Sequence, residues 1–167
     1  MRIMVMEGDT IWEVLREKGL SISTAESCTG GLLSHLITNV PGSSDYYKGG
    51  VVAYANEVKE EVLHVSREII EREGAVSAAC ARAMAEGVRR LLHADVGIAT
   101  TGIAGPTGGT PDKPVGLVYI ALATKNNVYH ERYIFHGDRE GNKRKAADAA
   151  LRMLREHILS RARSSER

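Results

Sequence analysis

The stretch ISTAESCTGGLLSHLITN, which spans residues 22–39, decides the fold of this 167-residue chain. Its opening belongs to a short strand predicted over residues 20–25, and the polar turn that follows contains two consecutive glycines. Over residues 31–39 the sequence favours a helix, which must end before Pro41. A strand, a tight turn and a helix in this order are typical of the repeating unit of an α/β domain.

Strands and helices continue to alternate on both sides of this stretch. A helix is predicted before it over residues 10–18, where apolar residues recur at helical spacing and Gly19 fits the end. The elements predicted after it are a strand (46–54), a short helix after Asn56, helices 66–73 and 77–92, a strand (95–101), a strand hairpin (116–124 and 128–136) and a last helix (139–159). The chain is therefore predicted to be one α/β domain over residues 1–167, a three-layer α/β/α sandwich with a mixed, mostly parallel sheet.

Charge, cysteine content and hydropathy exclude several classes of protein. A formal net charge of +1 lacks the basic excess of a nucleic-acid-binding domain, so no nucleic-acid partner is expected. No apolar run approaches the roughly 20 residues of a membrane span, and the N-terminal MRIMVMEGDT has neither the core nor the cleavage site of a signal peptide. Cys28 and Cys80 are interpreted as free thiols. We expect a cytoplasmic protein and, since symmetric assemblies are common, a homo-oligomer.

Ser27 lies between a predicted strand and a predicted helix, where open α/β sheets place their sites. At such a corner a serine can act as a nucleophile, and the N–H groups of the turn can stabilise an oxyanion. The alternative interpretation is that Ser27 only caps the helix, since serine is a preferred N-cap residue. The turn does not match the G-x-S-x-G pattern of the α/β-hydrolases.

A nucleophilic serine needs a base, and the sequence offers Lys59 more readily than a histidine. The six histidines are scattered and none has the spacing of a metal ligand pair, so no metal site is predicted. Lys59 follows Tyr54 and Asn56 just after a predicted strand, and Ser-Lys pairs are a known form of serine catalysis. A solvated lysine on an early helical turn is the alternative for Lys59.

A second glycine-rich loop, Thr101 to Gly109, follows another predicted strand, and its backbone can wrap around an anion such as phosphate. It lacks the spacing of the Walker A and Rossmann motifs, so a long structural turn is equally compatible with it. Asp138 is a reasonable N-cap for the last helix. The neighbouring Arg139 could hold a carboxylate or phosphate, or could be solvated.

These segments together resemble the nicotinamide-nucleotide amidase family, which occurs as the C-terminal domain of competence/damage-inducible CinA proteins. The motifs that carry the resemblance are STAESCTGG (23–31), YANEVK (54–59), TGIAGPTGG (101–109), KPVG (113–116) and GDR (137–139). They fall in the order of the family and cover roughly residues 10–160, and the larger N-terminal domain of full-length CinA proteins is not expected here.

The resemblance implies hydrolysis of the carboxamide of nicotinamide mononucleotide to nicotinate mononucleotide and ammonia. It implies that Ser27 is the nucleophile and Lys59 its base, assisted by Tyr54, with no metal and no cofactor. The substrate-binding residues that it implies are Thr29, Gly30, Gly31, Gly102, Ala104, Gly105, Gly108, Gly109 and Arg139.

The sequence departs from the family after GDR, where an Ile-Arg pair is frequent and this chain has Asn142 and Lys143, followed by Arg144. Any of Arg139, Lys143 and Arg144 could therefore hold the phosphate. Cys28 is a rival nucleophile beside Ser27. Two other functions remain open: a non-catalytic nucleotide-binding protein linked to competence or DNA damage, and a hydrolase that acts on another amide-bearing nucleotide or a pyrophosphate.

Overall fold

The computed structural model describes residues 11–165. The expectation about a signal peptide, and the first residue of the predicted N-terminal helix, lie outside this range. The described elements, in chain order, are α1 (Ile11–Lys18), β1 (Ile22–Glu26), α2 (Leu32–Thr38), the 3-10 helix η1 (Ser43–Asp45), β2 (Tyr47–Val52), α3 (Asn56–Glu61), α4 (Arg67–Arg72), α5 (Ala78–Leu91), β3 (Val96–Gly102), β4 (Leu117–Ala123), β5 (Val128–Ile134) and α6 (Arg139–Ser165). Every predicted strand is present, and the last helix runs six residues beyond its predicted end.

Five strands form one sheet in the order β2-β1-β3-β4-β5. β1 pairs in parallel with both β2 and β3, whereas β3–β4 and β4–β5 are antiparallel. The predicted mixed sheet is confirmed, with two parallel and two antiparallel pairs in place of the predicted parallel majority. Because three neighbouring parallel strands end at the same edge, the segments that follow β1, β2 and β3 are brought together there.

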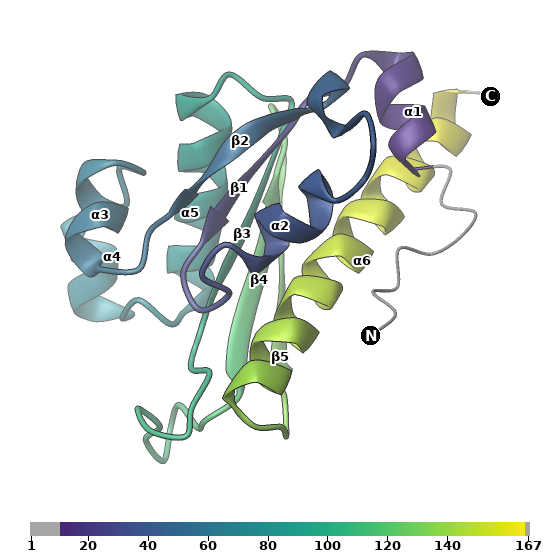
Figure 1. Ribbon diagram of the computed structural model, residues 1–167. Helices are drawn as coiled ribbons and strands as arrows, with labels where there is room; N and C mark the ends of the chain where they lie inside the picture. The colour runs from purple at the N-terminus through teal and green to yellow at the C-terminus, as the bar shows by residue number, and fades with distance from the viewer. Residues whose placement is uncertain (1–10, 166–167) are drawn as a thin grey trace.

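Helices cover both faces of the sheet and form the predicted three layers (Figure 1). α5 packs against β1, β3, β4 and β5 on one face, while α6 packs against β3 and β4 on the other and contacts α1 and α2. The short helices α3 and α4 lie at the side of α5 (Figure 1). No helix in residues 11–165 is long and apolar enough to cross a membrane.

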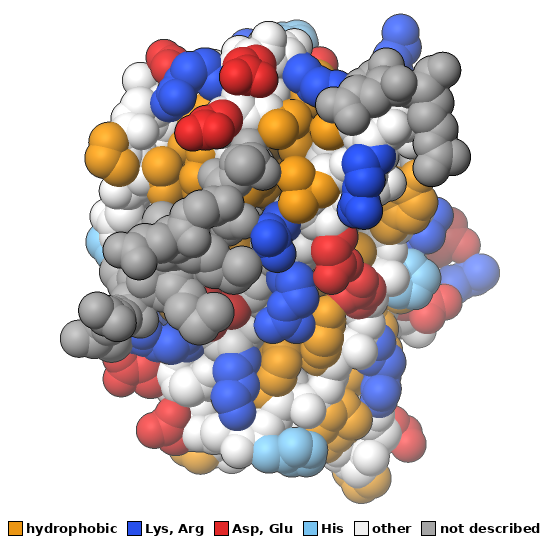
Figure 2. Space-filling view, turned by 90° about the vertical axis from the view of Figure 1, so that its right-hand side faces the viewer, with side chains coloured by type: hydrophobic (Ala, Val, Ile, Leu, Met, Phe, Trp, Pro, Cys, Tyr) orange, Lys and Arg blue, Asp and Glu red, His pale blue; other side chains and the backbone are white. Residues whose placement is uncertain are grey.

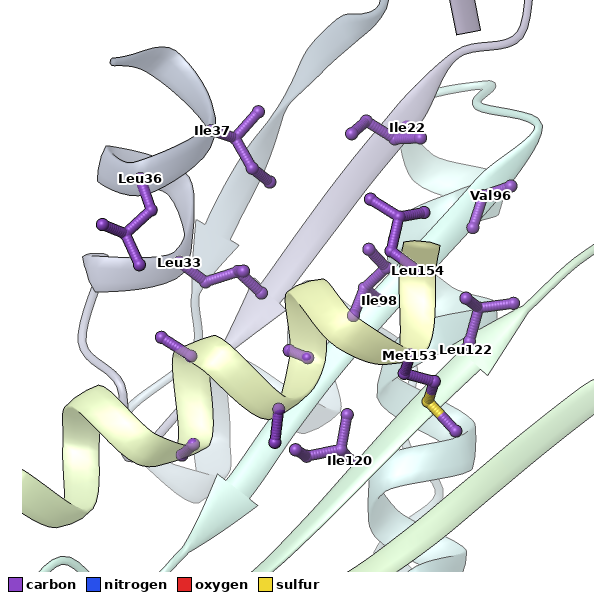
Figure 3. Packing of buried hydrophobic residues seen from close by; sticks show 14 of the residues in the cluster. Ile22, Leu33, Leu36, Ile37, Val96, Ile98, Ile120, Leu122, Met153 and Leu154 are labelled. Atoms are coloured by element: carbon purple, nitrogen blue, oxygen red, sulfur yellow. The ribbon is translucent and has the colours of Figure 1, made fainter. Parts of the chain in front are cut away.

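The sheet separates two hydrophobic cores because successive side chains of a strand point to opposite faces. On β4, Ile120 and Leu122 join the core under α6, whereas Ala121 and Ala123 join the core under α5. Figure 3 shows the larger side chains of the first core, contributed by β1, β3, β4, α2 and α6. Small residues on the other face allow α5 to approach the sheet closely.

The outer surface of α6 is solvated and carries both signs of charge. Its exposed residues include Lys145, Asp148, Arg152 and Glu156, which recur at helical spacing. Figure 2 shows blue and red side chains intermingled on this side of the molecule. The helix therefore presents an apolar side to the core and a mixed polar side to water.

Candidate active site

Ser27 directly follows β1 at the edge where the parallel strands end. Its N–H donates to the Thr100 carbonyl at 3.0 Å, and its own carbonyl accepts from the Gly30 N–H at 3.1 Å. The N-cap of α2 is Gly31, which offers no side-chain cap, so Ser27 does not cap this helix. The alternative that Ser27 caps α2 is therefore wrong. Ser27 is buried, with 8% of its surface exposed.

Two left-handed glycines shape the turn after Ser27. The φ angles of Gly30 and Gly31 are +59° and +103°, a region that side chains with a Cβ disfavour. In the described part of the chain the N–H groups of Thr29 and Gly31 have no hydrogen-bond acceptor, whereas that of Gly30 is engaged by Ser27. The turn thus offers two unengaged donors close to Ser27, the kind of group that stabilises an oxyanion.

Lys59 is buried on α3, with only 1% of its surface exposed, so it is not the solvated lysine of the alternative interpretation. Its Nζ donates to the Tyr54 carbonyl at 3.1 Å, and it forms no ion pair with any described residue. Burial lowers the pKa of its ammonium group below the usual 10.5, and the nearby thiols of Cys80 and Cys28 oppose this shift. A lysine in these surroundings is closer to a neutral amine, and hence to a base.

A cavity of about 180 Å³ brings these elements together at the edge of the sheet. Its lining residues are Ser27, Cys28, Tyr54, Asn56, Lys59, Ala75, Val76, Thr101, Gly102, Ala104 and Arg139. The three predicted catalytic residues and three of the predicted substrate-binding residues therefore share one cavity. The other predicted binding residues do not line it: Thr29, Gly30, Gly31, Gly105, Gly108 and Gly109.

The apolar wall of this cavity, Ala75 and Val76, was missed by the sequence analysis. These residues lie in the turn between α4 and α5, which is held to the site by two contacts. The hydroxyl of Thr101 donates to the Ala75 carbonyl at 2.8 Å, and Lys113 Nζ donates to the Glu73 carbonyl at 2.6 Å. Lys113 of the Lys-Pro-Val-Gly motif, together with Thr101, therefore holds the turn that contains Ala75 and Val76 against the site.

Arg139 joins the beginning of α6 to two other parts of the site. Its guanidinium donates to the Gly105 carbonyl at 2.6 Å and to the Tyr54 hydroxyl at 3.1 Å. Tyr54 is 62% exposed and meets Lys59 through its backbone carbonyl, while its hydroxyl is bonded to Arg139. Asn142, one turn along α6, is buried and donates to the Ala104 and Gly137 carbonyls, both at 3.0 Å.

A second cavity of about 550 Å³ adjoins the first and shares Ala104 and Arg139 with it. Its remaining walls include Pro106, Val115 and Glu140. A further cavity of about 280 Å³ lies between α5 and the α3–α4 connection, but none of its lining residues is a serine, lysine or cysteine. We therefore take the 180 Å³ cavity as the candidate active site, because it is lined by Ser27 and Lys59, whereas the two larger cavities have neither a serine nor a lysine in their walls.

Cys28, the rival nucleophile beside Ser27, is buried. Cys28 is 7% exposed, and burial, with a smaller effect of the Glu26 charge, raises the pKa of its thiol to about 12. A thiol needs to ionise to attack, so Cys28 is poorly suited to the role. Among residues 11–165 no group of His, Cys, Asp or Glu side chains is arranged to hold a metal ion.

Lys143 and Arg144, the other predicted phosphate ligands, lie near different residues: Lys143 near Gly30 and Arg144 near Asp148. The Nζ of Lys143 lies 3.5 Å from where a Cβ on Gly30 would be, so it stands over the turn that follows Ser27. Burial raises the pKa of the Asp148 carboxyl, and the charge of Arg144 on the same helix opposes this shift. Neither residue lines the 180 Å³ cavity.

Comparison with known proteins finds close relatives over nearly the whole chain. The family model of the CinA C-terminal domain matches residues 7–158. CinA-like proteins of Syntrophotalea carbinolica and Thermotoga neapolitana are 48% and 47% identical over 87% and 93% of this chain. These alignments cover only 35% and 38% of the relatives, so the chain spans a little over a third of their length.

Solved structures extend this similarity to the fold. A competence-damaged protein (CinA) superfamily protein from Klebsiella pneumoniae superposes with a TM-score of 0.87 at 34% identity, over 91% of this chain and 95% of that one. The competence/damage inducible protein CihA from Agrobacterium tumefaciens gives a TM-score of 0.83 at 38% identity, over 91% and 97% of the two chains.

Proposed function

The chain belongs to the CinA C-terminal domain family, and from this premise we propose that it is a nicotinamide-nucleotide amidase. The proposed reaction converts nicotinamide mononucleotide and water to nicotinate mononucleotide and ammonia. The observation that carries the proposal is the buried Lys59, whose pKa is lowered by burial and which lines one cavity with Ser27. A serine and a lysine amine without a charged partner, both lining one cavity, are the two groups that Ser-Lys acyl transfer uses.

In the proposed first step, the neutral amine of Lys59 takes the hydroxyl proton of Ser27 while Ser27 Oγ bonds to the carboxamide carbon. The carbonyl electrons move onto oxygen, and backbone N–H groups of the turn that follows Ser27 are the donors proposed to stabilise the negative charge. The C–N bond then breaks as Lys59 returns the proton to nitrogen, and ammonia leaves. An ester on Ser27 remains.

In the second step Lys59 takes a proton from water, and the resulting hydroxide attacks the ester carbon. The bond to Ser27 Oγ breaks, Ser27 recovers its proton from Lys59, and the nicotinate product is released. The proposal needs neither a metal nor a cofactor, because the base, the nucleophile and the oxyanion donors are all supplied by the chain.

The shape of the site supports a substrate larger than nicotinamide. Ala75 and Val76 offer an apolar wall for the pyridine ring, and Arg139 stands between the catalytic cavity and the larger one beside it. The ribose phosphate would therefore extend past Arg139, whose guanidinium can bind phosphate oxygens. We also propose a cytoplasmic location, supported by two free and buried thiols. Homo-oligomerisation remains a prediction.

The proposal is tested by ammonia release from nicotinamide mononucleotide, measured for the wild type, Ser27→Ala and Cys28→Ala. We expect turnover by the wild type and by Cys28→Ala, and a loss on the order of 10⁴-fold or more for Ser27→Ala. Nucleotide binding without ammonia from the wild type would favour the non-catalytic nucleotide-binding protein. Phosphate release in place of ammonia would favour a different hydrolase.

A further inference from the structure

The last residue of β1, Glu26, is a carboxylate with no solvent-exposed surface. It directly precedes Ser27 yet does not line the candidate catalytic cavity. Burying a carboxylate is costly unless its oxygens are well hydrogen-bonded. The partners of Glu26 therefore indicate what its charge is used for.

Both carboxylate oxygens of Glu26 are fully engaged. Oε1 accepts from the Thr29 hydroxyl and from the Leu33 N–H, each at 2.7 Å. Oε2 accepts from the Ser34 N–H at 3.0 Å and from the Ser34 hydroxyl at 2.6 Å. No ion pair to Glu26 exists within residues 11–165, so these donors alone stabilise its charge. Such charge-assisted hydrogen bonds are the strong ones in proteins.

These bonds fix both ends of the turn that follows Ser27. At its far end Glu26 binds two N–H groups of the first turn of α2, which has no side-chain cap of its own. At its near end Glu26 holds Thr29, whose hydroxyl also lies 2.7 Å from that of Thr100 on β3. The N–H groups of Thr29 and Gly31 are left without acceptors between these two anchors.

A polar network behind Glu26 fixes the carboxylate itself. The Ser34 hydroxyl lies 2.9 Å from that of Thr24 and 2.8 Å from that of Tyr47, which is 2.7 Å from Thr24 in turn. Gly50 leaves the space that this network occupies, since a Cβ there would lie 2.1 Å from the Thr24 hydroxyl. The network ties α2 to β1 and β2, so the carboxylate has little freedom to turn.

We propose that Glu26 is the positioning residue of this site: it sets the geometry of residues 27–31 and so fixes the direction in which the Ser27 hydroxyl enters the cavity. Glu26 acts through the turn and touches neither the substrate nor the cavity. It is not the base, because all of its acceptor positions in the structure are directed to α2 and Thr29. The inference rests on the proposed nucleophile Ser27.

The test compares Glu26→Gln and Ser34→Ala with the wild type by two readouts. A glutamine keeps the shape but presents an NH₂ group to donors, so the turn must shift, and a shift of about 1 Å can cost roughly 100-fold in rate. For Glu26→Gln we expect kcat for ammonia release to fall about 100-fold with little change in KM. Covalent labelling of Ser27 by a sulfonyl fluoride, followed by mass spectrometry, should slow in parallel. Ser34→Ala removes one of the four hydrogen bonds to Glu26, so its kcat and its labelling rate should lie between those of the wild type and of Glu26→Gln.

Ser66→Ala is the matched control, because it removes an N-cap bond to Ile69 at a helix outside the site. It should lower thermal stability without lowering kcat per folded molecule. If Glu26→Gln fails to fold, Ser34→Ala alone decides: full kcat and full labelling in that variant would overturn the proposal. So would a rise in KM at unchanged kcat in either variant.

The second readout separates this inference from the proposed substrate. If the wild type releases no ammonia but Ser27 is labelled, and labelling slows in Glu26→Gln, the positioning role holds and the amidase proposal fails. Absence of both turnover and labelling in the wild type would overturn the positioning role, since no reactive serine would then exist to be positioned.

Discussion

The amine of Lys59 leaves water on folding and finds one acceptor, the carbonyl of Tyr54, for its three possible donors. Desolvation penalises the charged form, and no described carboxylate forms an ion pair with Lys59 to restore it. The same burial that favours a base therefore also costs stability, because the unfolded chain holds the proton more tightly than the folded one.

Lys59→Met is expected to abolish ammonia release and to raise the melting temperature at neutral pH. Since the folded pKa of Lys59 lies below 10.5, its penalty is full below that folded pKa, shrinks above it and vanishes beyond 10.5. The gain in melting temperature should therefore decline as pH rises. Differential scanning measurements from neutral to alkaline pH, with the exposed Lys48→Met as control, would check this, and an equal or lower melting temperature at pH 7 would contradict it.

The activity of the wild type should depend on the same titration of Lys59, and should increase as the amine loses its proton. The base is the neutral amine, so kcat/KM should rise with pH through the lowered pKa of Lys59 and then level off. Ammonia release by the wild type, measured over the same range of pH, would check this dependence of kcat/KM on Lys59.

At the scale of elements, α5 approaches its neighbours closely because its inner residues are small. Gly87 is the clearest case: a Cβ there would lie 2.1 Å from the Leu63 carbonyl oxygen and 2.9 Å from the Leu63 carbonyl carbon. Leu63 lies four residues after Lys59, just beyond the end of α3. The position of the proposed base therefore depends on the absence of a side chain at Gly87 on the neighbouring helix α5.

Gly87→Ala is expected to destabilise the protein, although glycine to alanine in an open helix usually stabilises by about 0.5–1 kcal/mol. The added methyl group has to push Leu63 away, and overpacking of this kind costs about 1–3 kcal/mol. Chemical denaturation would measure the change, and ammonia release should fall as α3 moves. Arg82→Ala, on the exposed side of α5, is the control, and a more stable Gly87→Ala protein would refute the argument.

The elements were predictable from the sequence because their signals are local. Gly and Pro punctuation placed every strand, although β1 extends to Glu26, one residue past its predicted end. The status of Ser27 was not decidable, since the start of α2 depends on left-handed backbone at Gly30 and Gly31. Ala75 and Val76 were missed because small apolar residues carry no local signal, and only long-range contacts bring them to the cavity.

At the scale of the whole molecule, the candidate active site adjoins a second cavity, and the two share Ala104 and Arg139. The catalytic cavity, at about 180 Å³, is smaller than the roughly 300–1,000 Å³ usual for ligand pockets, whereas its neighbour, at about 550 Å³, lies within that range. A substrate that fills both takes binding energy from one and undergoes chemistry in the other. Binding energy from remote groups is used in this way to lower the barrier at the reacting centre.

Truncated substrates should therefore lose rate in order of size. Removing the phosphate, as in nicotinamide riboside, should lower kcat/KM about 10–100-fold, the equivalent of a hydrogen bond to a charged group worth about 1.5–3 kcal/mol. Free nicotinamide, which reaches only the smaller cavity, should be slower still. Ammonia release from the three compounds measures the series, and Arg139→Ala provides the internal control: it should bring the mononucleotide down to the rate of the riboside while leaving the riboside little changed. Equal kcat/KM for all three compounds would mean that the larger cavity takes no part in catalysis, and the phosphate would then have to lie elsewhere.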